Sequence, residues 1–483
     1  MSKVVRFGIL GESAYLGSVI FGGGSRIVSL GAQIFALFIM AWLLPKSEFG
    51  DMMTAFAVYR ILSYGIGTGC AAIVVYHVSR AATDEVELRT LRSFTVIGLV
   101  IAAILIGLMI SAAPSISAMV GKPRIAFWLL HLAPFGLLST LVTIASGAYD
   151  GRQEINRSIF VVELVPNLAR VLFLGALYAL SAPAIWVAYA LALAHLVSWL
   201  IILQRMLSPA VKGFYRVTRW DVGFTGRYIL HSLLSLQLQG VDMVVVGWLF
   251  TSDVAADYAI AGRIAALFPF FQQIVLKKFS PRCGQLLAAR DYSVLEAEAA
   301  ICRSSSIGAV AGLTGAILIV APIILHGAGN FTSAVTMLVA LGAAPFVRSF
   351  FAGGEAILRM AGQASFSLAI MAGSFAFVVA TPLLTHQWLG IFALPLGMTL
   401  SALVLNPLIV VRVHRLVGIR LLEWPDWVVL TIGLGVFAVA SHYASPEYMR
   451  VLAIGVAIIS LGGASLGLSL VRQRIPQNAR HQF

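Results

Sequence analysis

The chain has 483 residues, of which 60% are hydrophobic and only 11% are charged, against about 25% charged residues in soluble domains. This composition excludes a water-soluble globular protein, because too few charged residues are present to cover its surface. About 290 apolar residues, at about 20 for each crossing, would permit about fourteen membrane-spanning helices. The sequence therefore predicts an all-α polytopic membrane protein.

The N-terminal segment resembles a signal peptide only superficially. Lys3 and Arg6 precede an apolar stretch, but Glu12 and Ser13 interrupt it. A signal peptide needs about 7 to 15 continuous apolar residues. We therefore expect an uncleaved segment that faces the cytoplasm.

Apolar runs along the chain predict two pseudo-symmetric lobes of six helices each, followed by a C-terminal pair. We expect an N-lobe at 1–204, a cytoplasmic inter-lobe linker at 205–227, a C-lobe at 228–411, and the last helix pair with a cytoplasmic tail at 412–483. The predicted spans are about 26–44, 52–79, 93–119, 125–149, 158–180, 184–204, 228–250, 257–280, 304–326, 331–351, 364–386, 388–411, 427–443 and 450–471.

The basic residues predict the orientation, since Lys and Arg near span ends are retained on the cytoplasmic side. Of the 33 Lys and Arg residues, most fall in loops that face the cytoplasm if the N-terminus does. The outer loops hold only Lys46, Lys122, Arg124 and Arg450. The net charge of +13 is thus mainly a signal of topology and not of nucleic-acid binding. We expect a bacterial inner-membrane protein with both termini in the cytoplasm.

A weak internal repeat relates the two lobes. A shift of 206 residues aligns Gln33 with Gln239, Trp42 with Trp248, Leu43 with Leu249 and Asp51 with Asp257. Because each lobe has an even number of spans, the copies share one orientation, as in secondary transporters with a substrate path between two halves. A chance match between apolar helices is the alternative.

Three segments resemble the polysaccharide biosynthesis flippases of the multidrug/oligosaccharidyl-lipid/polysaccharide exporter superfamily. They are AWLLPKSEFGDMMTAFAVYRI at 41–61, YDGRQEINRSIFVVELVPNLARVLF at 149–173 and DMVVVGWLFTSDVAADYAIAGRIAAL at 242–267. The resemblance extends over roughly residues 20 to 415. It implies a cation-lined central cavity that accepts a lipid-linked oligosaccharide and moves its head group to the outer leaflet by alternating access.

Motifs for other chemistry are missing from the sequence. The pair Gly121-Lys122 is followed by Pro123 and lacks the phosphate-binding pattern of an ATP motor. The hydrolase and metal-dependent transferase motifs are also missing, so we expect no enzyme, no cofactor and no metal. The three cysteines, Cys70, Cys283 and Cys302, are far apart and are expected to be inert apolar residues. The glycines of Gly65-x-Gly67-x-Gly69 are expected to allow close helix packing.

Arginines inside apolar runs are the strongest candidates for substrate binding, because an Arg at a helix centre costs about 2.5 to 3.5 kcal/mol on insertion scales. Arg60 would lie about 13 Å below the outer end of its helix, and Arg263 at a similar depth in the second lobe. Guanidinium groups bind phosphate oxygens in a bidentate manner. Together with Arg170, these residues indicate a cavity for a lipid pyrophosphate.

Each arginine also has a purely structural alternative. Arg60 and Arg263 could pair with a nearby carboxylate or carbonyl, and Arg170 could pair with Glu163, two turns away on the same helix face. Arg26 and Arg348 lie near cytoplasmic ends, where they could extend to the membrane interface or form an entrance for an anionic head group.

Three acidic residues are candidates for coupling transport to H+ or Na+. Asp242 is the best, since it lies near the middle of its predicted span and a buried carboxylate can bind either ion. A fixed ion pair with an arginine is the alternative. Glu163 and Glu355 are weaker candidates.

The sequence thus favours a flippase that moves a lipid-linked oligosaccharide across the inner membrane for surface polysaccharide biosynthesis. Its expected partners are that lipid, the bilayer and a candidate polysaccharide polymerase or export machinery, with no nucleic acid. The alternatives are a multidrug/cation antiporter of the same superfamily, a lipid II flippase, and a membrane scaffold that transports nothing.

Overall fold

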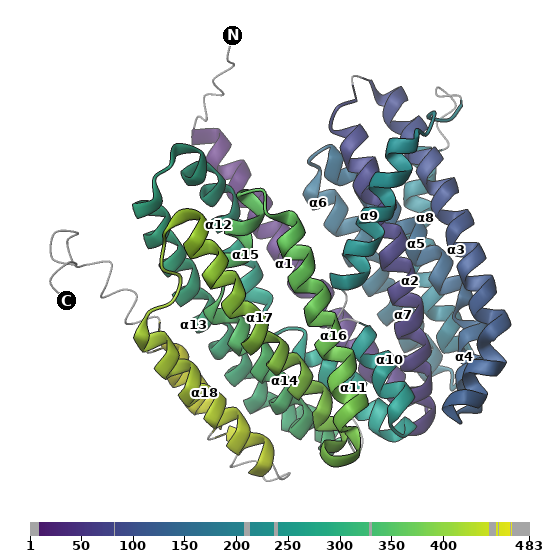
Figure 1. Cartoon of the computed structure of the whole chain (residues 1–483). Helices are drawn as coiled ribbons and strands as arrows, with labels where there is room; N and C mark the ends of the chain where they lie inside the picture. The colour runs from purple at the N-terminus through teal and green to yellow at the C-terminus, as the bar shows by residue number, and fades with distance from the viewer. Residues whose placement is uncertain are drawn as a thin grey trace, which may run out of the picture. The chain divides into compact units, whose positions relative to one another are not determined.

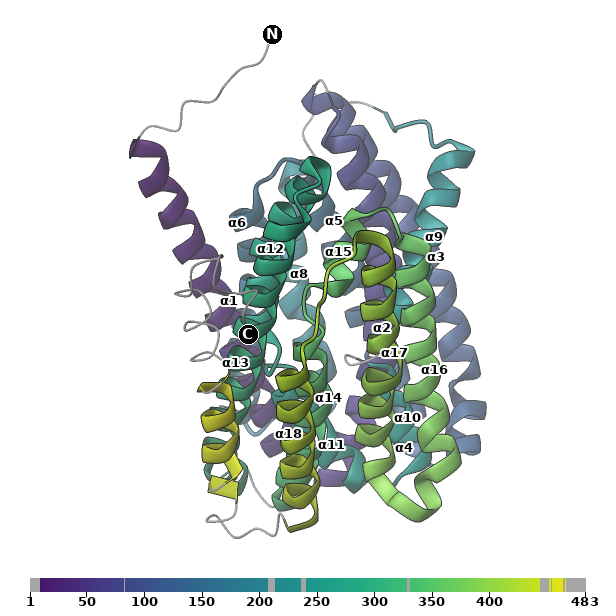
Figure 2. The same cartoon turned by 60° about the vertical axis from the view of Figure 1, so that its left-hand side comes forward.

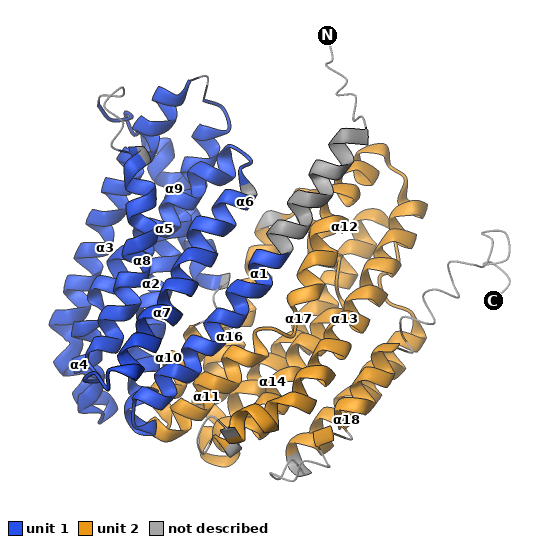
Figure 3. Ribbon diagram, turned by 180° about the vertical axis from the view of Figure 1, so that it is seen from behind, with its two compact units in different colours: residues 1–236 blue, residues 237–483 orange. Residues whose placement is uncertain are grey.

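Every regular element in the described part of the chain is a helix (Figure 1). The computed structural model describes residues 9–81, 83–206, 213–235, 240–327, 331–443, 451–452, 454–463 and 465. The chain divides into two compact units, Met1–Leu236 and Gln237–Phe483 (Figure 3). The all-helical fold class predicted from the sequence is confirmed.

Unit 1 is built around helix α2, which packs against α3, α4, α5 and α9. The elements of unit 1 are α1 (Ile9–Leu43), α2 (Lys46–Val78), α3 (Asp84–Val120), α4 (Pro123–His131), α5 (Ala133–Gly151), α6 (Ile155–Ser158), the π-helical segment η1 (Ile159–Leu164), α7 (Val165–Ala179), α8 (Trp186–Met206) and α9 (Arg219–Ser235).

Glycines let neighbouring helices approach α2 closely. A Cβ on Gly67 would lie 2.7 Å from Cβ of Thr143 in α5, closer than real Cβ contacts. On another face of α2, a Cβ on Gly69 would overlap the side chain of Ile229 in α9. The prediction that these glycines serve packing is confirmed.

Unit 2 has a second core, in which Phe279, Cys283, Cys302 and Ile357 are buried together. All three cysteines of the chain are free and buried, as expected. Helices α16 and α17 lie side by side (Figure 2). The elements of unit 2 are α10 (Val241–Leu249), α11 (Ser252–Ala265), α12 (Phe270–Ala289), α13 (Tyr292–Gly327), α14 (Thr332–Phe350), α15 (Gly354–Met360), α16 (Ala364–Leu389), the 3-10 turn η3 (Gly390–Phe392), α17 (Ala393–Val417) and α18 (Trp424–Tyr443).

The described residues contain nine helical stretches that are long and apolar enough to cross a membrane, or up to eleven if each bent pair is one span. The predicted number of fourteen is therefore not confirmed. One of the nine, Ser365–Val417, joins α16 and α17, which meet at the turn η3. Of the predicted last span, 450–471, the structure describes 451–452, 465 and the short apolar helix Ile454–Gly463.

Several spans predicted as continuous helices are bent or divided. The predicted span 125–149 contains α4 and α5, which are bent by 47° relative to each other. The predicted span 257–280 contains α11 and α12, which are bent by 41°, and Pro269 lies between them, directly before α12. Proline lacks a backbone N–H and clashes with the preceding turn, so it interrupts the helix. The predicted span 228–250 is divided between α9 and α10.

The border between the two units lies later in the chain than the predicted start of the C-lobe. The predicted linker, 205–227, ends inside α9, which packs against α2 and belongs to unit 1. Residues 207–212 of the linker and the predicted tail from 466 onwards lie outside the described residues. The second unit begins at Gln237 and not at residue 228.

Helix ends follow the 206-residue register of the internal repeat. Helix α1 ends at Leu43 and α10 at Leu249, while α2 begins at Lys46 and α11 at Ser252. The aligned pair Asp51 and Asp257 is buried in both copies. The alignment found in the sequence thus matches equivalent helix boundaries in the two units.

Candidate functional site

Two of the predicted arginines lie near each other in unit 1. Arg60 is a partly buried residue of α2, and Arg170 is a partly buried residue of α7. They are close enough for their like charges to interact. Tyr64, one turn after Arg60, also lies within range of the Arg60 charge. In unit 1, Arg60 and Arg170 thus place two positive charges within helices that are apolar enough to span a membrane.

Arg170 has no acidic partner among the residues that the structure describes. Its Nε atom is buried and makes no hydrogen bond there. The nearby residue His195 of α8 is buried, and its Nδ1 lies 3.0 Å from the carbonyl oxygen of Leu191. Because a buried cation without a counter-ion is unfavourable, an anion bound beside Arg170 would be stabilised.

The predicted alternative of an Arg170–Glu163 ion pair is wrong. Glu163 pairs with Arg26 of α1, at 3.4 Å between Oε1 and Nη2. Glu163 lies in the π-helical segment η1, one residue before its end.

Backbone contacts hold Glu163 against α1. Its carbonyl oxygen accepts hydrogen bonds from Oγ of Ser29, at 3.2 Å, and from Nδ2 of Asn167, at 2.6 Å. Nδ2 of Asn167 also lies 2.7 Å from Oγ of Ser29. These contacts attach the backbone of η1 to α1 and to the first turn of α7.

The predicted site residues of unit 2 lie on several helices. Arg263 is in the last turn of α11, just before the bend at Pro269, and is partly buried. Nη2 of Arg348 in α14 lies 3.4 Å from Oγ of Ser374 in α16. Glu355, at the start of α15, is close enough to Arg348 for their opposite charges to attract. The structure therefore brings Arg348 and Glu355 together.

Asp242 lies in the first turn of α10 and is buried. Its Oδ2 accepts a hydrogen bond of 2.9 Å from the hydroxyl of Tyr258 in α11. A second buried carboxylate of unit 2, Asp257, accepts a hydrogen bond from Ser333 of α14. Neutral hydroxyl donors thus stabilise both carboxylates.

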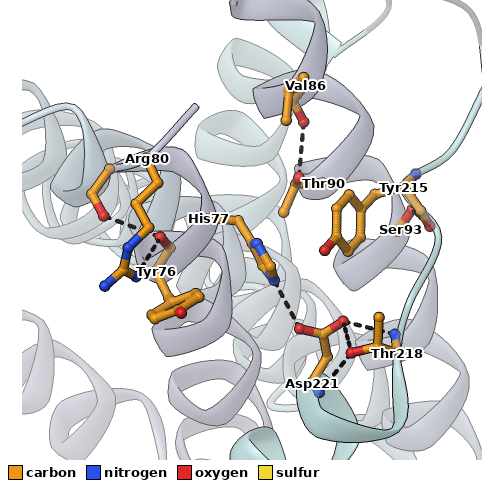
Figure 4. Close-up of polar contacts among 10 residues, drawn as sticks. Tyr76, His77, Arg80, Val86, Thr90, Ser93, Tyr215, Thr218 and Asp221 are labelled. Carbon is orange, nitrogen blue, oxygen red and sulfur yellow. Dashed lines mark hydrogen bonds and ion pairs between the residues drawn. The ribbon is translucent and has the colours of Figure 1, made fainter. Parts of the chain in front are cut away.

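A polar cluster that the sequence did not predict joins α2 to the start of α9 (Figure 4). Nε2 of His77 lies 2.8 Å from Oδ1 of Asp221. The backbone N–H and the hydroxyl of Thr218 donate to Oδ2 of Asp221, at 2.7 and 2.8 Å. Burial acts to raise the pKa of Asp221, but these hydrogen bonds outweigh it and hold the pKa below its usual range. No sequence signal connects residues 144 positions apart.

The ring of Tyr215 packs against His77 in the same cluster, with 4.7 Å between ring centroids (Figure 4). The backbone N–H of Tyr215 donates to Oγ of Ser93 in α3 at 2.8 Å. The segment before α9 is thereby attached to both α2 and α3. The cluster holds part of the predicted linker against unit 1.

An apolar groove of about 410 Å³ in unit 2 is lined by side chains of α18 and of the helix Ile454–Gly463. No group of three or more His, Cys, Asp or Glu residues in the described ranges could hold a metal ion. The groove suits hydrocarbon rather than a charged head group.

Solved transporters share this fold at low sequence identity. An inward-facing multidrug resistance MATE family transporter of the MOP superfamily is 16% identical, with a TM-score of 0.64 over 80% of this chain and 98% of that one. The lipid II flippase MurJ, in an inward closed conformation, is 13% identical, with a TM-score of 0.69 over 94% of this chain and 100% of that one. The chain therefore has the fold of these multi-pass transporters.

The sequence comparison identifies the family. No curated protein matches the chain. The sequence pattern of a family described as polysaccharide biosynthesis protein matches residues 39–281, which is just over half of the chain. The chain belongs to the polysaccharide biosynthesis protein family.

Proposed function

We propose that the protein is a flippase that moves a lipid-linked oligosaccharide with a pyrophosphate head group from the cytoplasmic to the outer leaflet of the bacterial inner membrane. The observation that carries the proposal is the neighbouring pair Arg60 and Arg170 inside membrane-spanning helices of unit 1. Two cations that repel each other are both stabilised by a group with several negative oxygens, and guanidinium groups bind phosphate oxygens in a bidentate manner.

The same charge argues against a cationic cargo at this position. A cationic drug would add a third positive charge beside Arg60 and Arg170, which is unfavourable where water is scarce. The family membership supports a role in polysaccharide biosynthesis. Arg26, Arg263 and Arg348 are proposed as further contacts for the head group, and Asp242, Glu163 and Glu355 as candidates for coupling to H+ or Na+.

The test is polysaccharide export and lipid flipping by variants of the full chain. Arg60→Ala and Arg170→Ala are expected to reduce flipping of a pyrophosphate-linked oligosaccharide in proteoliposomes, and the double variant to reduce it at least about tenfold, as expected for the loss of about 1.4 kcal/mol or more. Arg157→Ala is the matched control, because Arg157 is exposed and lies on a short helix of the same unit.

The outcomes separate the classes of function. Wild-type flipping by the double variant would contradict the proposal. Drug efflux that survives in the double variant, with no flipping by the wild-type protein, would indicate an antiporter instead. Undisturbed polysaccharide export in cells that carry the double variant would favour a scaffold.

A further inference from the structure

The ion pair between Arg26 and Glu163 has the features of a contact that can be exchanged. Nη2 of Arg26 lies 3.4 Å from Oε1 of Glu163. The side chain of Arg26 is 33% exposed and that of Glu163 is 41% exposed. Partly exposed ion pairs contribute little to stability. A phosphate that reaches Arg26 therefore has only a weak contact to replace.

Arg26 also keeps an unused donor. Its Nε atom is buried and makes no hydrogen bond within the described residues. A guanidinium group can donate from Nε and a terminal nitrogen to two oxygens at once. Glu163 takes only one of these positions, whereas a phosphate group would take both.

The backbone around Glu163 does not depend on its carboxylate. Ser29 and Asn167 bind the carbonyl oxygen of Glu163, and they hold η1 against α1. The side chain can therefore leave Arg26 while the helices stay in place. A π-helical turn of this kind often occurs at functional sites.

From these observations we infer that Glu163 is an internal competitor for the anionic head group, occupying Arg26 when no substrate is bound. The inference rests on the proposed function and adds a regulator to the same site. Substrate phosphate displaces the carboxylate from Arg26, and the returning carboxylate helps to expel the head group after translocation.

The test is binding of farnesyl pyrophosphate and inorganic pyrophosphate to the purified full-length protein, measured by calorimetry. Glu163→Gln removes the competing charge and is expected to tighten binding about two- to fivefold, the range set by a partly exposed ion pair. Glu163→Asp, with a shorter side chain, should give a smaller gain. The gain should vanish when Arg26→Ala is added.

Glu85→Gln is the matched control, because Glu85 also pairs with an arginine, Arg89, on the surface of unit 1. It removes the same charge and should leave pyrophosphate affinity unchanged. Melting curves of all variants establish that each is folded. A lipid-specific site would bind farnesyl pyrophosphate more tightly than the inorganic ion.

Two results would overturn the inference in different ways. If wild-type binding depends on Arg26 but Glu163→Gln binds no more tightly, Glu163 is not a competitor and the proposed function stands. If neither probe binds to the wild-type protein or to Glu163→Gln, the proposed function falls as well.

Discussion

Nε2 of His77 lies 2.8 Å from Oδ1 of Asp221, so the last turn of α2 is joined to the first turn of α9. Asp221 is almost fully buried, at 1% exposure, and also accepts two hydrogen bonds from Thr218. This carboxylate therefore links α2, α9 and the segment that precedes α9.

Replacement of Asp221 is expected to destabilise the attachment of α9. Asp221→Asn keeps the shape of the side chain but loses its charge and one acceptor, which should cost about 1.5 to 3 kcal/mol, as for hydrogen bonds to charged groups. The melting temperature of the purified protein should fall. An unchanged melting temperature at neutral pH would contradict this account.

The contribution of Asp221 should depend on pH in one direction. Because the pKa of Asp221 is lowered in the folded protein, its stabilisation is fully present above the unfolded pKa of about 3.9. It is lost as the pH falls through the lower, folded pKa. The difference in melting temperature between wild type and Asp221→Asn should be fully present at about pH 5 and shrink below about pH 4.

A second carboxylate prediction concerns the start of α3. Glu87 is buried and accepts a hydrogen bond from Nε of Arg152, the residue that comes directly after α5. Glu87→Gln should lower the free energy of unfolding by about 1.5 to 3 kcal/mol. Glu85→Gln, which alters an exposed pair with Arg89, should change it by about 0.5 kcal/mol or less. If Glu87→Gln and Glu85→Gln lose the same free energy of unfolding in thermal melts, burial of Glu87 does not strengthen its pair with Arg152.

The sequence predicted the helical class and the close packing at Gly67, because these follow from composition and local pattern. It predicted the family because three of its segments resemble those of known members. The 206-residue repeat also anticipated equivalent helix ends at Leu43 and Leu249. Partners across the fold could not be predicted in the same way. Glu163 pairs with Arg26 of α1 and not with Arg170, and hydrophobic periodicity gives no signal for a contact between helices so far apart in the sequence.

A further prediction concerns the packing of α5 against α2 and involves no charged residue. A Cβ on Gly147 would lie 2.5 Å from the carbonyl oxygen of Ala71, a backbone atom that cannot move aside cheaply. Gly147→Ala should therefore separate α5 from α2 and cost about 1 to 3 kcal/mol. The control is Gly107→Ala in α3, where a Cβ meets nothing within 4 Å.

The stability of both glycine variants can be measured by thermal unfolding and by the yield of monodisperse protein. Gly107→Ala should be neutral or slightly stabilising, since alanine favours helix over glycine by about 1 kcal/mol. Similar behaviour of the two variants would show that the α2–α5 contact is not as tight as the distance indicates.

Variants of Asp242 and of its hydrogen-bond donor Tyr258 test whether transport is coupled to an ion gradient. If the buried Asp242 carboxylate binds the driving ion, Asp242→Asn should abolish the dependence of flipping on a proton or sodium gradient, because a neutral amide neither takes up a proton nor balances a sodium charge. Tyr258→Phe removes the 2.9 Å hydrogen bond but keeps the carboxylate. This variant should remain coupled, with a changed ion concentration for half-maximal transport. Gradient-dependent flipping by Asp242→Asn in proteoliposomes would assign coupling to another residue.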